Sequence, residues 1–125
     1  ESQQHLVEET RSVGPGNIVL VRVETPHVTE IFSSCGSRGV SAEKVARRAA
    51  DQTARYLAAD VPVGPHLADQ LLLPLALAGG GEFRTMPPTQ HTVTNSRIIE
   101  QFLDVTVQIQ PESEESENVR ISVTR

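Results

Sequence analysis

Residues 64–83 read GPHLADQLLLPLALAGGGEF, and this segment organises the second half of the chain. Pro65 is tolerated in the first turn of a helix, where no intrahelical hydrogen bond needs its N–H group, and Gly79–Gly81 ends the helix. The segment predicts a helix over residues 65–78, then a strand over residues 82–86 that Pro87 and Pro88 stop. Beyond its first turn the helix is almost entirely Leu and Ala, so we expect it to be buried on all sides.

The first turn of this helix carries its only group of polar side chains. His66, Asp69 and Gln70 have the i, i+3, i+4 spacing that places side chains on one helix face. They lie beside backbone N–H groups that favour anions. Pro74 has no N–H for the carbonyl of Gln70, which permits a kink. The pattern indicates a ligand-binding face, but a polar helix start at the surface explains it as well.

A second polar segment, PPTQHTVTN, occupies residues 87–95. We expect Thr94 or Asn95 to cap a third helix that runs to Leu103, which leaves His91 in the loop just before it. A neutral imidazole is nucleophilic, so His91 could attack a phosphate held by helix N–H groups and threonine hydroxyls. A loop histidine without a chemical role fits the same pattern. In sequence, the only cations close to His91 are Arg84 and Arg97.

The periodicity of apolar residues predicts the remaining elements of the second half. The third helix has an apolar face at residues 98, 99, 102 and 103. Two strands are centred on residues 105–109 and 119–123, with the acidic residues 111–117 as a hairpin loop. This order of elements predicts an α+β fold, with helices packed on one face of a small mixed β-sheet.

The first half predicts a hairpin and a helix. The strands cover residues 17–24 and 29–34, and the helix covers residues 41–59 with Ser41 as its N-cap. The expected buried stripe of this helix comprises Val45, Ala49, Thr53, Tyr56 and Leu57. Arg47, Asp51 and Arg55 lie opposite, at spacings that permit ion pairs. Pro62 and Gly64 mark a domain boundary.

Composition excludes several classes of protein. The 125 residues carry a formal net charge of -5, which argues against non-specific nucleic-acid binding. No apolar run approaches the roughly 20 residues of a membrane helix, so we expect no membrane partner. Cys35 is the only cysteine, which excludes an intrachain disulfide. Five of the 11 basic residues lie between residues 38 and 55, and the simplest interpretation is a solvated face.

Four segments together resemble the RNA 3′-terminal phosphate cyclase family. Residues 64–83 resemble its C-terminal signature, and residues 90–95, QHTVTN, follow at the family's spacing. Residues 14–17, GPGN, and 39–43, GVSAE, are also similar. The resemblance covers nearly the whole chain from residue 13, and a long ordered match is far more specific than a short motif.

The resemblance implies a ligase-type nucleotidyl-transfer mechanism. In this family ATP reacts with a histidine to give covalent histidine–AMP, the AMP passes to an RNA 3′-phosphate, and the 2′-OH closes a 2′,3′-cyclic phosphate. The catalytic histidine falls on His91, and the Asp-Gln pair of the nucleotide pocket falls on Asp69 and Gln70. Position 66 is often a tyrosine that packs on adenine, so His66 is expected to stack there with a smaller ring.

The resemblance also implies that the chain is a C-terminal fragment. Family members carry a long N-terminal part built of repeated modules with two helices on a four-stranded sheet. We expect residues 1–61 to be the C-terminal half of an inserted small α/β domain, and residues 62–125 to be the last module. The implied cofactors are ATP and Mg²⁺ or Mn²⁺, with the metal ligands in the missing part and none in this chain.

The implied partners are RNA 3′-phosphate ends, ATP and the missing N-terminal part. The implied location is the cytoplasm of a bacterium or archaeon, or the nucleus of a eukaryote. Two alternatives remain open: a non-catalytic cyclase-like protein of ribosome assembly, which lacks the nucleophile, and an inactive binding module. The presence of His91 favours the enzyme.

Overall fold

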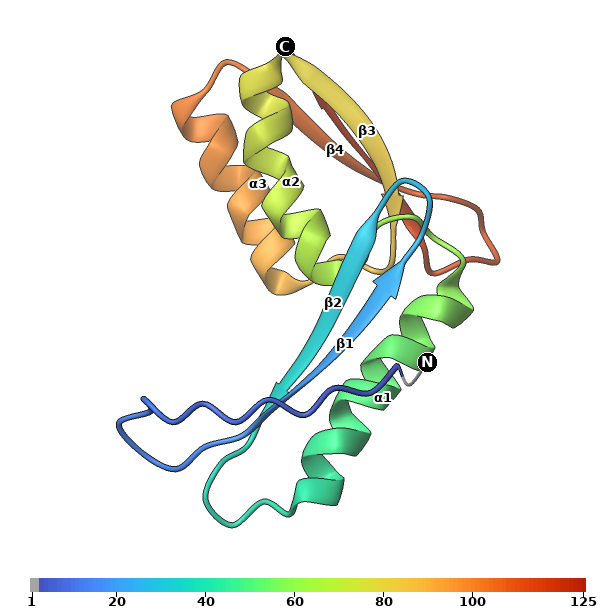
Figure 1. Cartoon of the computed structure of the whole chain (residues 1–125). Helices are drawn as coiled ribbons and strands as arrows, with labels where there is room; N and C mark the ends of the chain where they lie inside the picture. The colour runs from blue at the N-terminus through green and yellow to red at the C-terminus, as the bar shows by residue number, and fades with distance from the viewer. Residues whose placement is uncertain (1–2) are drawn as a thin grey trace.

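The computed structural model describes residues 3–125. These residues form two units of helices packed on strands, which are joined through residues 60–64 (Figure 1). The elements, in chain order, are β1 (Ile18–Glu24), β2 (Thr29–Cys35), α1 (Ala42–Ala59), α2 (Pro65–Ala78), β3 (Gly80–Thr85), α3 (Gln90–Phe102), β4 (Thr106–Pro111) and β5 (Val119–Thr124). The α+β class expected from the sequence is confirmed.

In the first unit, α1 covers one face of the antiparallel β1–β2 hairpin. Ser41 caps α1 as predicted, because its hydroxyl accepts from the backbone N–H of Lys44 at 3.4 Å. The buried residues of α1 are Val45, Ala49, Thr53 and Tyr56. The prediction for Leu57 was wrong, since this side chain is 60% exposed. The two-stranded sheet is too narrow to cover that flank of the helix.

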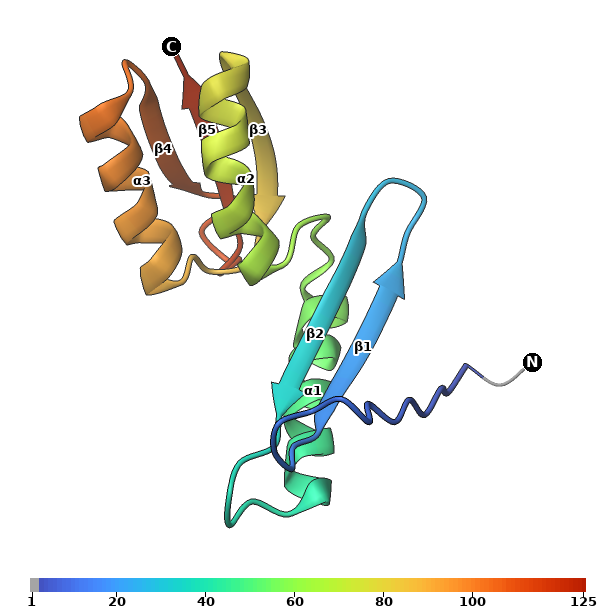
Figure 2. The same cartoon turned by 60° about the vertical axis from the view of Figure 1, so that its left-hand side comes forward.

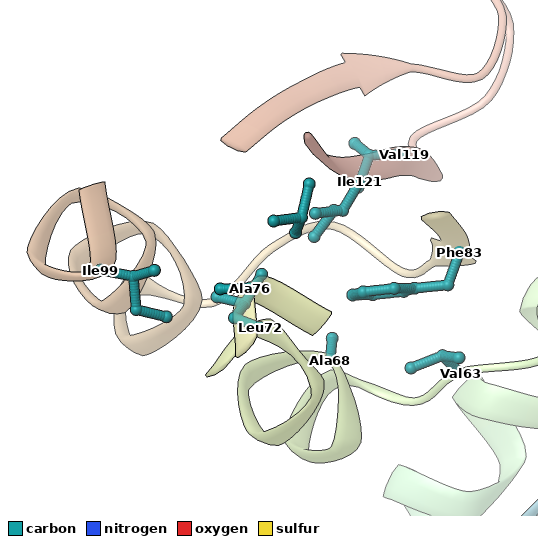
Figure 3. Close-up of a cluster of buried hydrophobic side chains, with 9 residues drawn as sticks. Val63, Ala68, Leu72, Ala76, Phe83, Ile99, Val119 and Ile121 are labelled. Atoms are coloured by element: carbon teal, nitrogen blue, oxygen red, sulfur yellow. The ribbon is translucent and has the colours of Figure 1, made fainter. Parts of the chain in front are cut away.

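In the second unit, α2 and α3 lie side by side on one face of a three-stranded sheet (Figure 2). The strand order is β3-β5-β4, and both pairings are antiparallel. The sheet is therefore antiparallel rather than mixed as expected, and the parallel pairing found among the described residues is limited to an isolated bridge between Val63 and Thr85. The predicted hairpin through the acidic residues corresponds to β4 and β5. Figure 3 shows side chains from both helices and the sheet meeting in the core, among them Leu72, Ile99 and Ile121.

The strand after α2 begins two residues earlier than predicted. Gly79 ends α2 in the left-handed conformation, with φ 91°. Gly80 and Gly81 then pair with Thr124 and Val123 as the start of β3. A Cβ on Gly81 would lie 2.7 Å from a Leu75 methyl carbon, so glycine allows β3 to start directly against α2.

Neither helix of the second unit is buried on all sides, contrary to the expectation for α2. Leu73 and Leu77 of α2 are 46% and 70% exposed, and Pro74 is exposed on the same helix, which continues through it to Ala78. On α3, Ile99 is buried, whereas Phe102 is 81% exposed. The sheet covers one side of the helix layer, and the other side faces outward with large apolar side chains.

Hydrogen bonds across the junction hold the two units together. The Asn118 amide donates to the carbonyl of Ala59 at 2.8 Å, and Tyr56 Oη donates to the carbonyl of Pro62 at 3.2 Å. Met86 of the second unit packs against the small core of the first. The division into domains at residues 1–61 and 62–125 stays a prediction.

Candidate functional site

The first turns of α2 and α3 lie at the same end of the helix pair (Figures 1 and 2). Asn95 connects the helices, because its side-chain amide donates to the carboxylate of Asp69 at 3.1 Å and to the Asp69 carbonyl at 3.3 Å. His91 precedes Asn95 by four residues and therefore lies on the same face of α3, one turn nearer the N-terminus. His91 is exposed and Asp69 is half-buried. The fold places all four predicted site residues, His66, Asp69, Gln70 and His91, at this end of the second unit.

The start of α3 differs from the prediction. Thr89 is the N-cap, and its hydroxyl accepts from the backbone N–H of Thr92 at 3.2 Å. His91 is therefore the second residue of the helix rather than part of the preceding loop, and Thr94 and Asn95 lie inside the helix. From its position inside the helix, Asn95 donates its side-chain amide to Asp69. His91 thus projects from a fixed helical turn beside N–H groups that favour anions.

A cavity of about 440 Å³ opens beside these turns, between the two units. It is lined by Phe32, Gln52, Arg55, Pro65, His66, Met86, Pro87, Thr89 and Glu117. Its volume lies in the range of small-ligand pockets. His66 is the one predicted site residue that lines it, and Thr89 brings the start of α3 to its wall. Arg55 reaches it from α1, a contribution that the sequence pattern did not predict.

The nearby cations differ in their availability. Arg84 forms an ion pair with Glu112, and its guanidinium also donates to the carbonyl of Asp60 at 3.4 Å. Arg97 is exposed on α3. Arg84 is thus engaged in the junction between the units, which leaves Arg55 as the cation at the cavity.

A buried carboxylate that sequence reasoning missed fixes the N-terminus of α2. Glu30 of β2 is 4% exposed and accepts a hydrogen bond from the backbone N–H of Gly64, the N-cap of α2. Burial raises the pKa of Glu30, while the Gly64 hydrogen bond and the charge of His66 oppose that rise. A Cβ on Gly64 would lie 2.9 Å from the Glu30 carboxylate. The signal was present in the sequence, since Glu30 alternates with the buried Phe32 and Ser34 along β2.

Glu30→Ala should lower the free energy of unfolding by about 1–3 kcal/mol, because it leaves the Gly64 N–H buried without an acceptor. Glu30→Gln keeps an acceptor and should cost less. A raised pKa means that the folded state favours the protonated carboxyl. The contribution of Glu30 to stability is therefore full below the ordinary value of 4.5 and declines as pH rises through the raised pKa.

Urea denaturation of the three proteins across this pH range measures both effects. In the Glu30→Gln protein, the free energy of unfolding should lack the part of its decline with rising pH that the titration of Glu30 causes. Equal stability of the Ala and Gln variants would contradict the role of the hydrogen bond to Gly64.

Residues 3–125 provide neither a ready metal site nor a membrane span. Within them, no three or more His, Cys, Asp or Glu side chains cluster in an arrangement that could hold a metal ion. None of their helices has the length and apolar character required to span a bilayer.

The chain is similar to a family of known proteins over most of its length. The family model described as RNA 3′-terminal phosphate cyclase matches residues 7–109. Relatives named RNA 3′-terminal phosphate cyclase include one from Ectopseudomonas mendocina, 48% identical over 78% of this chain and 28% of its own length. One from Koribacter versatilis is 48% identical over 90% of this chain and 31% of its own. One from Salmonella agona is 40% identical over 99% of this chain and 35% of its own length. The chain thus spans about a third of the length of these curated relatives.

Proposed function

Because the chain belongs to the RNA 3′-terminal phosphate cyclase family, we propose that it is the C-terminal part of an ATP-dependent enzyme that converts an RNA 3′-phosphate into a 2′,3′-cyclic phosphate. The observation that carries the proposal is the position of His91. Its imidazole is exposed in the first turn of α3, on the helix face where Asn95 holds Asp69 of α2. A nucleophile needs this combination of access and fixed orientation.

The chemistry consists of three displacements at phosphorus. A ring nitrogen of His91 attacks the α-phosphorus of ATP; the N–P bond forms, and the P–O bond to pyrophosphate breaks. An oxygen of the RNA 3′-phosphate then attacks the same phosphorus and releases His91. Finally the 2′-OH loses its proton and attacks the RNA phosphorus, which expels AMP and closes the ring. A phosphate monoester cannot easily expel oxide, whereas the anhydride formed in the second step expels AMP.

The residues of α2 fit the nucleoside part of ATP. His66 lines a cavity of small-ligand size together with the apolar side chains of Phe32, Pro65 and Met86, and such surroundings suit a flat heterocycle. We propose that His66 stacks on adenine and that Asp69 and Gln70 bind polar groups of the nucleotide. The hydrogen bond from Asn95 holds the Asp69 carboxylate in place for this role.

A divalent metal, Mg²⁺ or Mn²⁺, would supply charge stabilisation for the phosphates. Residues 3–125 offer no group of three acidic or histidine ligands. We therefore propose that the ligands come from the part of the protein that this chain does not span. In the steps above, the residues of this chain bind the nucleotide, orient it and provide the nucleophile.

We propose that the same missing part covers the apolar surfaces that the fold leaves open. Leu77 on α2 and Phe102 on α3 are 70% and 81% exposed. On the hairpin, Leu20 and Ile31 are 60% and 53% exposed on the face opposite α1. Outward apolar faces on both units are typical of surfaces that contact further protein.

The test is to incubate the complete protein with ATP labelled at the α-phosphate and with Mg²⁺ or Mn²⁺. A covalent, acid-labile AMP adduct should form without RNA. A 3′-phosphorylated oligoribonucleotide should then discharge the adduct and acquire a cyclic phosphate. A complete protein that binds RNA but never forms the adduct would support the non-catalytic alternative instead.

His66→Tyr should preserve the affinity for ATP or strengthen it a few-fold, since a larger ring offers more stacking area. Asp69→Ala is the informative comparison, because it should weaken ATP binding and slow adenylylation while the fold stays intact. Equilibrium binding of ATP and circular dichroism measure the two properties separately. Loss of ATP affinity in a well-folded His66→Tyr protein would argue against stacking.

A further inference from the structure

The outward face of α1 carries a row of cations. Arg47 and Arg48 follow Lys44 by three and four residues, and Arg55 follows Arg48 by seven. These spacings place the four cations on one side of the helix, together with a single anion, Asp51. We call these five residues the basic stripe. The stripe has a formal charge of +3, whereas the whole chain carries -5. All five residues are exposed.

The cations of the stripe have no ion-pair partners among residues 3–125. The four ion pairs in this part of the protein use Arg11, Arg22, Arg84 and Arg120, all outside α1. The ion pairs that the sequence permits between Asp51 and its neighbours do not form. Instead, Arg55 Nε donates to the backbone carbonyl of Asp51 at 3.3 Å. The stripe therefore presents uncompensated positive charge to the solvent.

The stripe leads to the candidate site. Its last cation, Arg55, lines the cavity that His66 and Thr89 also line, and no other Lys or Arg among the described residues does so. From Lys44 to Arg55 the stripe extends for about 16 Å, at about 1.5 Å per residue. Figure 1 shows the C-terminal end of α1 reaching the junction with the second unit. A polyanion bound with one end at the site could therefore contact the stripe cations in turn, from Arg55 to Lys44.

We propose that the basic stripe binds the phosphodiester backbone of the RNA strand upstream of its 3′ end. This proposal rests on the proposed function, which brings the 3′-terminal phosphate to His91. The strand must then leave the site, and every upstream nucleotide carries a negative charge. Cations without partners, in a row that starts at the cavity, match that charge pattern. The contacts are to phosphates, so they give affinity without sequence preference.

The experiment uses the complete enzyme and 3′-phosphorylated oligoribonucleotides of two lengths, a dinucleotide and one of about ten nucleotides, within the site sizes of single-strand binding proteins. The double substitution Arg47→Gln, Arg48→Gln should lower kcat/KM about tenfold for the long RNA. It should leave the dinucleotide and the rate of adenylylation by ATP unchanged. Arg47→Lys, Arg48→Lys keeps the charge and should retain most of the activity. Arg120→Gln, Arg125→Gln removes two charges near the opposite ends of β5, away from α1, and is the control for the loss of two charges.

Binding of the long RNA, followed by fluorescence anisotropy at several salt concentrations, provides a second readout that does not need turnover. Removal of two phosphate contacts should reduce the slope of log K against log salt by about 1.4. An unchanged slope, an equal loss on both RNA lengths, or a stripe covered by the rest of the protein would each overturn the proposal. A wild-type enzyme that forms no AMP adduct would refute the proposed function alone, and the salt slope would still decide the role of the stripe.

Discussion

His91→Ala should abolish both the covalent AMP adduct and the cyclisation of RNA by the complete enzyme. The expected loss exceeds the roughly 10²–10⁴-fold that follows removal of a general base, because the adduct is an obligatory intermediate of the proposed route and no neighbouring group replaces the nucleophile. His91 is exposed at the second position of α3. An alanine at that position leaves the Thr89 cap and the buried Thr92 in place, so the fold should survive.

The adduct is measured with labelled ATP after acid quenching, and cyclisation is measured with a 3′-phosphorylated oligoribonucleotide. His91→Asn offers a polar side chain of similar reach without a nucleophilic ring nitrogen and should be equally inactive. His27→Ala, in the exposed turn between β1 and β2, is the matched control and should behave as wild type. An adduct that persists in the His91→Ala protein would assign the chemistry to another residue.

Periodicity was sufficient to find the elements of this fold. The helices at residues 42–59 and 65–78 and the strands around Val107 and Ile121 follow directly from the spacing of apolar residues. Local signals for helix ends were equally reliable where one residue dominates, as at the N-cap Ser41 and the C-cap Gly79. These features depend on neighbours in the chain, which a single sequence contains in full.

The start of α3 could not be predicted because three residues compete for the same role. Thr89, Thr94 and Asn95 are all favourable N-caps. In the structure the Thr89 hydroxyl accepts from the N–H of Thr92, and Asn95 instead donates its side-chain amide to Asp69 of a different helix. Exposure of Phe102 was missed for a related reason, since periodicity shows that a face is apolar but not how far a three-stranded sheet extends to cover it.

The candidate site shows more clearly that a single sequence groups residues close in the chain but not residues far apart in it. His66, Asp69 and Gln70 lie within one helical turn, so their spacing in the sequence is sufficient to group them. Glu30 and Gly64 are 34 residues apart and belong to different units, so only the tertiary structure reveals their hydrogen bond. Arg55 was interpreted as part of a solvated face, yet it lines the cavity. The chemical role of His91 came from the family resemblance, because a single histidine in a polar segment carries little information.

The 125-residue chain alone should show no cyclisation above background, although it contains the proposed nucleophile. Nucleotidyl transfer depends on positioned charges around the phosphates, and residues 3–125 provide no cluster of metal ligands. The relatives that this chain matches are about three times as long. The remaining groups should therefore come from the part that the chain does not span.

The test of this inactivity is to mix the purified chain with ATP, Mg²⁺ or Mn²⁺ and a 3′-phosphorylated oligoribonucleotide and to measure cyclisation. Addition of the separately produced N-terminal part should restore turnover. The control is the same mixture with the His91→Ala chain, which should stay inactive after complementation. Sedimentation should also show self-association of the isolated chain, since Leu77, Phe102 and Leu20 expose apolar surface. Turnover by the chain alone at the rate of the complete enzyme would place every catalytic group within these residues and would refute the division of labour between the two parts.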